Sequence, residues 1–340
     1  MEQEHTPLKW RGVASLRHPV GSSVCLGLAC LLSATLSCDA PQAATTIATV
    51  PRQDAIPSDI QKVTPPTDEH PPILHSPDFL QPEPVTGGVN TAGAEDSAFV
   101  TPDGEALYFF FTPDVRVPAE RQLTDGVTGI YASTKQGDTW AEAQRVPLQK
   151  QGELALDGCV FVQENSMWFC SAREGNYRGV DMWTAERREG RWLDWQNAGE
   201  QVNVDHLVGE MHITAAGQSM YYHSDLSGGQ GGMDIWVIER EGEGWSAPRN
   251  LEEVNSSETD GWPFVTEDGK ELWLTRTYLG TPALYRSRMG PEGWQEPELI
   301  VSQFAGEASL DREGNLYFTH HFFHNGRMLE ADIYVAHRAS

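Results

Sequence analysis

From residue 79 onward, short hydrophobic runs alternate with turn residues, and the same order of runs recurs five times. In each copy an acidic residue precedes a short β-type run, and a turn then leads to a second run rich in aromatic residues. These second runs are Leu107–Phe109, Met167–Phe169, Met220–Tyr222, Leu272–Leu274 and Leu316–Phe318. Short apolar runs bounded by turn residues predict β-strands, and a period of about 50 residues predicts a repeat architecture.

Two further runs complete most copies. The third runs are Ile130-Tyr131, Met182-Trp183, Ile235-Trp236, Leu284-Tyr285 and Ile333-Tyr334, and the fourth begin at Trp140, Trp192, Trp245 and Trp294. The fifth copy lacks a fourth run, but Phe79–Pro82 and Val89–Thr91 repeat the pattern of Trp245–Pro248 and Val254–Ser256. The sequence therefore predicts an all-β fold over residues 73–340, a single five-bladed β-propeller closed by an N-terminal strand.

Two stretches carry a family resemblance. Ser224–Trp236 (SDLSGGQGGMDIW), followed by Trp245 and Pro248, resembles the TolB-type, WD40-like repeat of bacterial envelope propellers, as does Pro263–Gly269 (PFVTEDG). The resemblance implies a propeller fold and a place in the bacterial envelope. Because this repeat serves many roles, the resemblance implies no reaction.

The first 38 residues have the pattern of an export signal. Basic residues precede an uncharged, largely apolar stretch, residues 24–36, which is too short to span a bilayer comfortably. The ending Thr35–Cys38 resembles a bacterial lipobox, which implies lipidation of Cys38. Cys30 is a second candidate, and a plain signal peptide is the alternative. We expect a signal peptide over residues 1–38 and an exported protein, lipid-anchored at the periplasmic or outer face of the cell envelope.

Residues 39–72 are rich in Pro, Thr, Ala and Gln and nearly free of aromatic residues. Such a composition buries too little apolar surface to offset the loss of chain entropy. We therefore expect residues 39–72 to form a disordered tether between a membrane anchor and the propeller.

The net charge of the chain limits the classes of partner that it can bind. The 340 residues include 24 basic and 49 acidic side chains, a formal net charge of −25. This field repels a phosphate backbone, and no run of Lys or Arg opposes it, so nucleic acid is excluded. A protein or a glycan is compatible with the charge. No motif implies a cofactor.

The repeats place candidate site residues around one mouth of the central channel. An acidic residue stands at the start of each first strand, where these strands line the channel: Asp96, Asp157, Glu210, Asp260 and Glu307, with Glu95 beside the first. The ends of the second strands should surround them with Asp114, Arg173, Asp225, Arg276, His320 and His321. Converging polar groups favour a ligand site, which could also hold a divalent cation. In the structural alternative, the acids recur with the repeat and accept hydrogen bonds from neighbouring linkers.

Two functions from different classes follow. The preferred hypothesis is a non-catalytic, membrane-tethered scaffold that presents its ring to a protein or glycan. The alternative is a glycan-active enzyme, because arabinanase-type five-bladed propellers carry two acids and a Glu on successive inner strands, as Asp96, Asp157 and Glu210 fall here. Divergent pKa values of two ring carboxyls would favour the enzyme, and acids bonded to backbone amides would favour the scaffold.

Two cysteines lie on the first two strands of the second copy. A turn at residues 164–165 places Phe161 opposite Trp168 and Cys159 opposite Cys170. Opposed cysteines in an oxidising compartment predict a disulfide. The alternative is a pair of buried thiols that fill space between blades.

Overall fold

The computed structural model describes residues 50–339, so the predicted signal peptide and Cys38 lie outside the described residues. The described chain contains strands β1 to β24 and only short helices, α1 (Arg52–Ala55), α2 (Ala119–Gln122), a 3-10 turn (Pro65–Thr67) and a π turn (Gln201–Asp205). None of these helices is long and apolar enough to cross a membrane. The expected all-β fold is confirmed.

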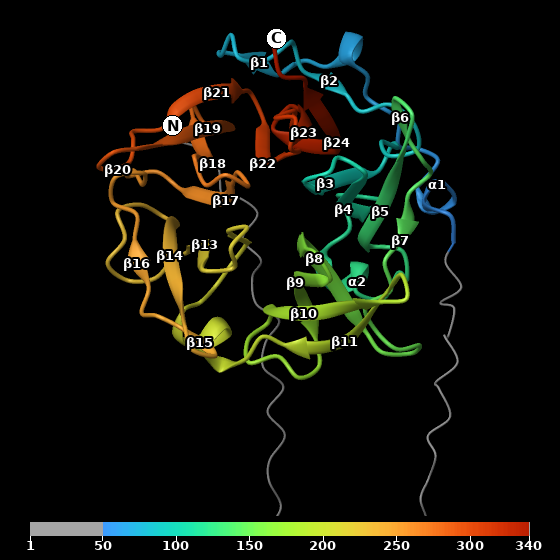
Figure 1. The fold of residues 1–340 in the computed structure, drawn as a ribbon. Helices are drawn as coiled ribbons and strands as arrows, with labels where there is room; N and C mark the ends of the chain where they lie inside the picture. The colour runs from blue at the N-terminus through green and yellow to red at the C-terminus, as the bar shows by residue number, and fades with distance from the viewer. Residues whose placement is uncertain (1–49, 340) are drawn as a thin grey trace, which may run out of the picture.

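Each sequence repeat forms an antiparallel group of strands whose first member faces the centre of the molecule (Figure 1). The first strands are β3 (Ala94–Val100), β8 (Ala155–Gln163), β12 (Met211–Ile213), β17 (Asp260–Val265) and β22 (Ala305–Leu310). The second strands are β4 (Ala106–Thr112), β9 (Ser166–Arg173), β13 (Ser219–Ser224), β18 (Glu271–Tyr278) and β23 (Leu316–His324). The third strands are β5 (Gly129–Gln136), β10 (Asp181–Arg188), β14 (Asp234–Glu241), β19 (Thr281–Gly290) and β24 (Arg327–Ala336).

Short strands complete the outer edges. They are β6 (Thr139–Trp140), β7 (Gln144–Arg145), β11 (Arg191–Asn197), β15 (Gly244–Trp245), β16 (Arg249–Asn250), β20 (Gly293–Trp294) and β21 (Glu298–Ser302). The groups form four hydrogen-bonded sheets, because a single parallel bridge between Ala331 and Ala94 joins the last and first repeats into one sheet of nine strands. No closed sheet forms among residues 50–339. The arrangement is propeller-like.

Aromatic side chains of the second strands fill the space between the sheets. Phe109, Phe169, Tyr222 and Phe318 hold the same repeat position and are fully buried. Alternation along a strand sends every second side chain to one face, which is why the aromatic runs read as strands from sequence. One hydrophobic cluster extends through all five repeats. It stabilises the stacking of the sheets around the centre.

The segment before the first repeat adds strands to the end of the chain. β2 (Glu83–Pro84) pairs antiparallel with β24, with Glu83 opposite Val335, and an isolated bridge joins Phe79 to Arg338. The repeat pattern predicts a strand of this segment at the same place. β1 (Ile73–Leu74) pairs with β21 of the fourth repeat.

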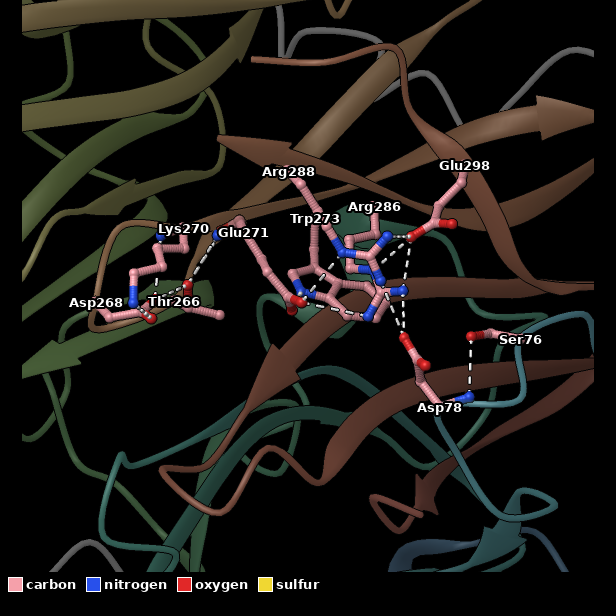
Figure 2. Close-up of polar contacts among 10 residues, drawn as sticks. All are labelled: Ser76, Asp78, Thr266, Asp268, Lys270, Glu271, Trp273, Arg286, Arg288 and Glu298. Atoms are coloured by element: carbon pink, nitrogen blue, oxygen red, sulfur yellow. Dashed lines mark hydrogen bonds and ion pairs between the residues drawn. The ribbon is translucent and has the colours of Figure 1, made fainter. Parts of the chain in front are cut away.

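A buried arginine ties this segment to the fourth repeat (Figure 2). The Arg286 side chain is 1% exposed and its guanidinium lies 2.6 Å from Asp78, 2.6 Å from Glu298 and 3.3 Å from Glu271. The same guanidinium stacks 5.4 Å from the ring centre of Trp273. Three carboxylates and an aromatic face offset the cost of burying this charge.

The structure differs from the predicted tether of residues 39–72 in the part it describes. Arg52 is buried at 3% exposure and contacts Glu95 at 3.1 Å. The Asp68 carboxylate accepts a hydrogen bond from Nε2 of His320 at 2.8 Å, and both side chains are buried. From residue 50 onward the segment therefore packs on the propeller. Composition misses this docking because a few charged side chains, with Ala55, Ile56 and Val63 packed against the core, are enough to make it.

A disulfide links Cys159 and Cys170, with a Cα–Cα distance of 5.3 Å. Phe161 faces Trp168 as predicted, but Cys170 opposes Gly158 rather than Cys159. A β-bulge between Gly158 and Phe161 inserts an extra residue into β8 and shifts the register. The predicted direct opposition of the two cysteines is therefore wrong by one residue, yet the shift keeps them within bonding distance.

Candidate functional site

A bulge recurs in the first strand of four repeats and decides which side chains face the centre. At this bulge, residues other than glycine adopt positive φ angles: Ser97 (52°), Cys159 (51°), Trp262 (53°) and Glu307 (60°). The strand pairings shift register at the same four places. A bulge turns one side chain away from the regular alternation, often beside a functional site. In the third repeat, Glu210 holds the corresponding position just before β12.

The five acids predicted to form one ring occupy two different positions. Asp157 and Asp260 lie two residues before the bulge residue and are buried at 2% and 0% exposure. Each is bonded to an arginine of the neighbouring second strand: Asp157 to Arg173 and Asp260 to Arg276, both at 2.5 Å. These four residues thus form internal ion pairs. Their charges are therefore paired within their own repeats and are not free for a ligand, as the predicted binding ring requires.

Glu95 holds the same position in the first repeat, where the second strand supplies Phe111 in place of an arginine. Its cation comes from the N-terminal segment instead. Arg52 donates to Glu95 at 3.1 Å and to the backbone oxygen of Val89 at 3.0 Å. Arg276 makes the equivalent pair of bonds within the fourth repeat, to its acid and to the backbone oxygen of Val254. Glu95 is therefore a structural residue.

The remaining acids, Asp96, Glu210 and Glu307, meet at the centre with His321. We call these four residues the axial cluster. Nε2 of His321 lies 3.2 Å from Asp96, and the side chains are 17% and 26% exposed. The Ser97 N–H donates to Glu307 at 2.7 Å and to Asp96 at 3.0 Å. The Ser97 N–H thus joins the Asp96 and Glu307 carboxyls. Three repeats thus contribute carboxyls to one partly exposed site.

The axial carboxyls do not share the same charge state. Burial opposes ionisation of Asp96, but the charge and hydrogen bond of His321, with bonds from Glu307 and Ser97, lower its pKa below the usual value. Burial and then the charge of Asp96 raise the pKa of Glu210 to about 8. Burial and the charges of Asp96 and Glu210 raise the pKa of Glu307 well above its usual value. Burial disfavours the His321 imidazolium, but Asp96 outweighs burial and raises the pKa of His321.

Two residues that the sequence reasoning missed border this cluster. The Trp262 indole N–H donates to Glu210 at 3.0 Å, and the Trp262 backbone N–H donates to Nδ1 of His223 at 3.1 Å. The two rings pack with their centres 5.1 Å apart. Burial lowers the pKa of His223 to about 4, so this histidine is neutral at pH 7. The positive φ of Trp262 could not be seen in a sequence pattern of period two.

Other predicted residues lie outside the cluster. Asp114 pairs with Arg116 at 2.8 Å, Asp225 lines a cavity of about 210 Å³ beside the Gly228–Gly232 loop, and His320 bonds to Asp68. Among residues 50–339, no three His, Cys, Asp or Glu side chains are grouped so that they could hold a metal ion.

Neither a family model nor a curated protein matches the chain. Solved structures do. TolB from Acinetobacter baumannii matches 74% of this chain and 56% of its own, at 12% identity and a TM-score of 0.42. A xylan beta-1,4-xylosidase from Bacillus halodurans matches 77% and 54%, at 13% identity and a TM-score of 0.47. An alpha-L-arabinofuranosidase from Lactobacillus brevis matches 72% and 90%, at 12% identity and a TM-score of 0.46.

TolB proteins, which the repeat motif resembles, are thus among the structures similar to this chain. The chain spans about half the length of the A. baumannii and B. halodurans proteins. At these TM-scores and identities, the likenesses carry no argument about function.

Proposed function

We propose that the chain is an exported, membrane-tethered five-bladed β-propeller, closed by β2, that binds an envelope protein or a glycan at its axial cluster without transforming it. The observation that carries this proposal is the meeting of Asp96, Glu210, Glu307 and His321 from three repeats at a partly exposed centre. The acids of the other two repeats, Asp157 and Asp260, lie two residues earlier and are paired with internal arginines. Five strand groups and the pairing of β2 with β24 support the fold part of the proposal.

The axial cluster offers carboxyl groups that a ligand could contact. Asp96 is paired with His321 at 3.2 Å and Glu210 accepts the Trp262 indole N–H at 3.0 Å, so a cationic or hydrogen-bond-donating group of a ligand would compete with these contacts. The acidic surface of the chain would also attract a basic partner.

A direct test compares binding by the full chain and by a Glu210→Gln/Glu307→Gln variant. Glutamine keeps the size of each side chain and removes its capacity to ionise. We expect the variant to lose at least about tenfold in affinity for partners recovered by envelope pull-down or glycan array. Glu241→Gln, at an exposed glutamate of β14, is the matched control. Unchanged binding by the double variant would exclude the axial cluster as the binding site.

One observation favours a glycan-active enzyme as the second candidate. Asp96 has a lowered pKa and Glu210 a raised one, which is the division between a carboxylate and a general acid. Of the three acids that the arabinanase-type comparison suggested, Asp157 is paired with Arg173, which leaves Asp96 and Glu210. Hydrolysis of aryl glycosides or polysaccharides that Glu210→Gln abolishes would establish this alternative. Binding without turnover would support the scaffold.

The proposed anchor has its own test. Cys38→Ala should move the protein from the membrane fraction to the soluble fraction. Membrane association that survives this substitution would contradict lipidation at Cys38 and direct attention to Cys30.

A further inference from the structure

Two repeats share a buried pair at the outer edge of the sheet. Asp181 begins β10 and accepts a hydrogen bond from Asn197 of β11 at 2.8 Å. Asp234 begins β14 and accepts one from Asn250 of β16 at 3.0 Å. Both aspartates are about 98% buried or more and also accept backbone N–H groups of the preceding loop. The internal carboxylate thus satisfies the outer strand and the loop together.

In the first repeat both members of this pair are exchanged. Gly129, which precedes Ile130 and Tyr131, stands where the second, third and fifth repeats have aspartate and the fourth has Ala283. Arg145 lies opposite Tyr131 across β5 and β7, in the register that Asn250 has with its own third strand. A Cβ atom added at Gly129 would lie 3.4 Å from the Arg145 guanidinium. A cation therefore occupies this place, and the first repeat lacks the carboxylate that the second and third repeats supply there.

The Arg145 guanidinium is poorly satisfied. Its only hydrogen bond within residues 50–339 is a long one, 3.3 Å, to the backbone oxygen of Thr128. Its Nε is buried and has no partner in this part of the chain. Asp125, in the adjoining loop, already accepts from the N–H groups of Val127 and Thr128. A buried donor without an acceptor costs about 1 to 3 kcal/mol, so the site favours a ligand that brings one.

The same guanidinium lines a cavity of about 130 Å³ between the loops 122–128 and 149–155. Oε1 of Gln149, another lining residue, is also buried without a partner. The cavity thus presents an unpaired donor and an unpaired acceptor. Lys150 adds a second cation to the lining, although Glu153 lies 3.8 Å from it.

We propose that this cavity binds the carboxylate of a small ligand that also carries a hydroxyl or ammonium donor. Arg145 holds the carboxylate, because the planar guanidinium presents two parallel N–H groups that match its oxygens. Gln149 accepts the donor of the ligand through Oε1. The ligand carboxylate replaces the aspartate that the second and third repeats provide internally. This site is separate from the axial cluster and does not depend on the proposed function.

Calorimetric titration of the full chain tests the site with four probes: sodium D-glucuronate, dialanine, propionate and D-glucose. Glucuronate represents an acidic sugar and dialanine a peptide C-terminus, so the tighter of the two identifies the source of the carboxylate. Propionate lacks the donor and glucose lacks the charge. We expect glucuronate or dialanine to bind and glucose to bind at least about tenfold more weakly, the discrimination that a charge-assisted bond provides.

Arg145→Gln should weaken binding at least about tenfold. Gln149→Leu should weaken the donor-bearing probe severalfold and leave propionate unchanged. Arg249→Gln, at an exposed arginine of the equivalent edge strand β16, is the control and should bind normally. If Arg145→Gln does not fold, Arg145→Lys replaces it, because lysine keeps the charge but loses the fork. Absence of binding by every carboxylate probe, or binding that neither Arg145 variant weakens, would overturn the proposal.

Discussion

Asp157 and Asp260, which we call the outer acids, lie within two residues of the repeat position that holds the acids of the axial cluster. The two groups nevertheless have opposite environments. Asp157 and Asp260 each face an arginine of their own repeat at 2.5 Å. Asp96, Glu210 and Glu307 face one another, and His321 is the cation that contacts Asp96. The difference shows how a repeat separates stability from recognition. Acids two residues before the bulge form ion pairs within their repeats, and acids at or beside the bulge gather at the centre, where burial and mutual repulsion separate their pKa values.

The first repeat belongs to both groups, because Glu95 and Asp96 are adjacent. Glu95 obtains its arginine from residue 52, outside the repeats. Burial raises the pKa of Glu95 to about 8 despite the charge of Arg52.

The largest expected effect follows from removing Arg52. Arg52→Ala leaves Glu95 buried without its cation and removes the stacking of the guanidinium at 5.1 to 5.3 Å from the rings of Phe109, Phe111 and Tyr131. We expect a loss of about 3 to 5 kcal/mol in the free energy of unfolding, measured by urea denaturation.

Arg116→Ala is the matched control, because its partner Asp59 also lies in the N-terminal segment but both side chains are exposed. It should cost less than about 1 kcal/mol. Equal losses in the two variants would contradict the structural role assigned to the outer acids.

The disulfide has the next effect. Cys159 occupies the bulge position of the second repeat, so a covalent bond stands there in place of an axial polar group. Cys159→Ser with Cys170→Ser should lower stability by about 2 to 3 kcal/mol, since the bond restricts the unfolded chain. Thiol titration of unfolded protein should find two more thiols after reduction than before. An equal count in both conditions would show that the bond does not form.

The pH dependence of stability tests the axial carboxyls. A carboxyl with a raised folded pKa contributes stability at low pH that is lost as the pH rises toward that value. Glu95 and Glu210, both near 8, and Glu307 therefore predict a fall of about 2 kcal/mol in unfolding free energy between pH 7 and 9.

Below pH 6.5 two histidines act in the opposite direction. Burial lowers the pKa of His212 to about 3 and that of His223 to about 4, so both take up protons on unfolding and reduce stability in acid. The raised carboxyls outnumber these histidines, so denaturation curves across pH 5 to 9 should show stability falling as the pH rises, with a smaller slope below pH 6.5 than between pH 7 and 8. A rise in stability from pH 7 to 9 would contradict the raised carboxyl pKa values.

The smallest effect is expected at one axial carboxyl. Glu210→Gln removes a charge that burial and Asp96 oppose, while glutamine can still accept the Trp262 indole N–H. We expect the variant to gain about 1 kcal/mol at pH 9 and less at pH 5, where the carboxyl is already protonated. Asp260→Asn should instead destabilise at both pH values, because it leaves Arg276 without its carboxylate. The same sign for both variants would erase the distinction between the two groups.

The sequence by itself determined the strands, their order and much of their register. Alternation and turn residues locate the β8–β9 hairpin, and Phe161 faces Trp168 as the turn predicts. The half-repeat around Phe79 likewise placed the segment that supplies β2 beside the last repeat. These features depend on turn geometry and on the alternation of buried and exposed side chains along a strand. Both are visible in residues that are close together in the sequence.

Which charged side chains contact one another depends on the tertiary structure. A bulge residue with positive φ, such as Glu307, points its side chain in a direction that the spacing of the acids along the sequence does not predict. The acids predicted to form one ring therefore fall into the outer acids and the axial cluster. The docking of Arg52 on Glu95 joins residues 43 positions apart through a single buried ion pair. Long-range pairing of charges leaves no periodic signal in sequence, because one side chain on each partner is enough to make it.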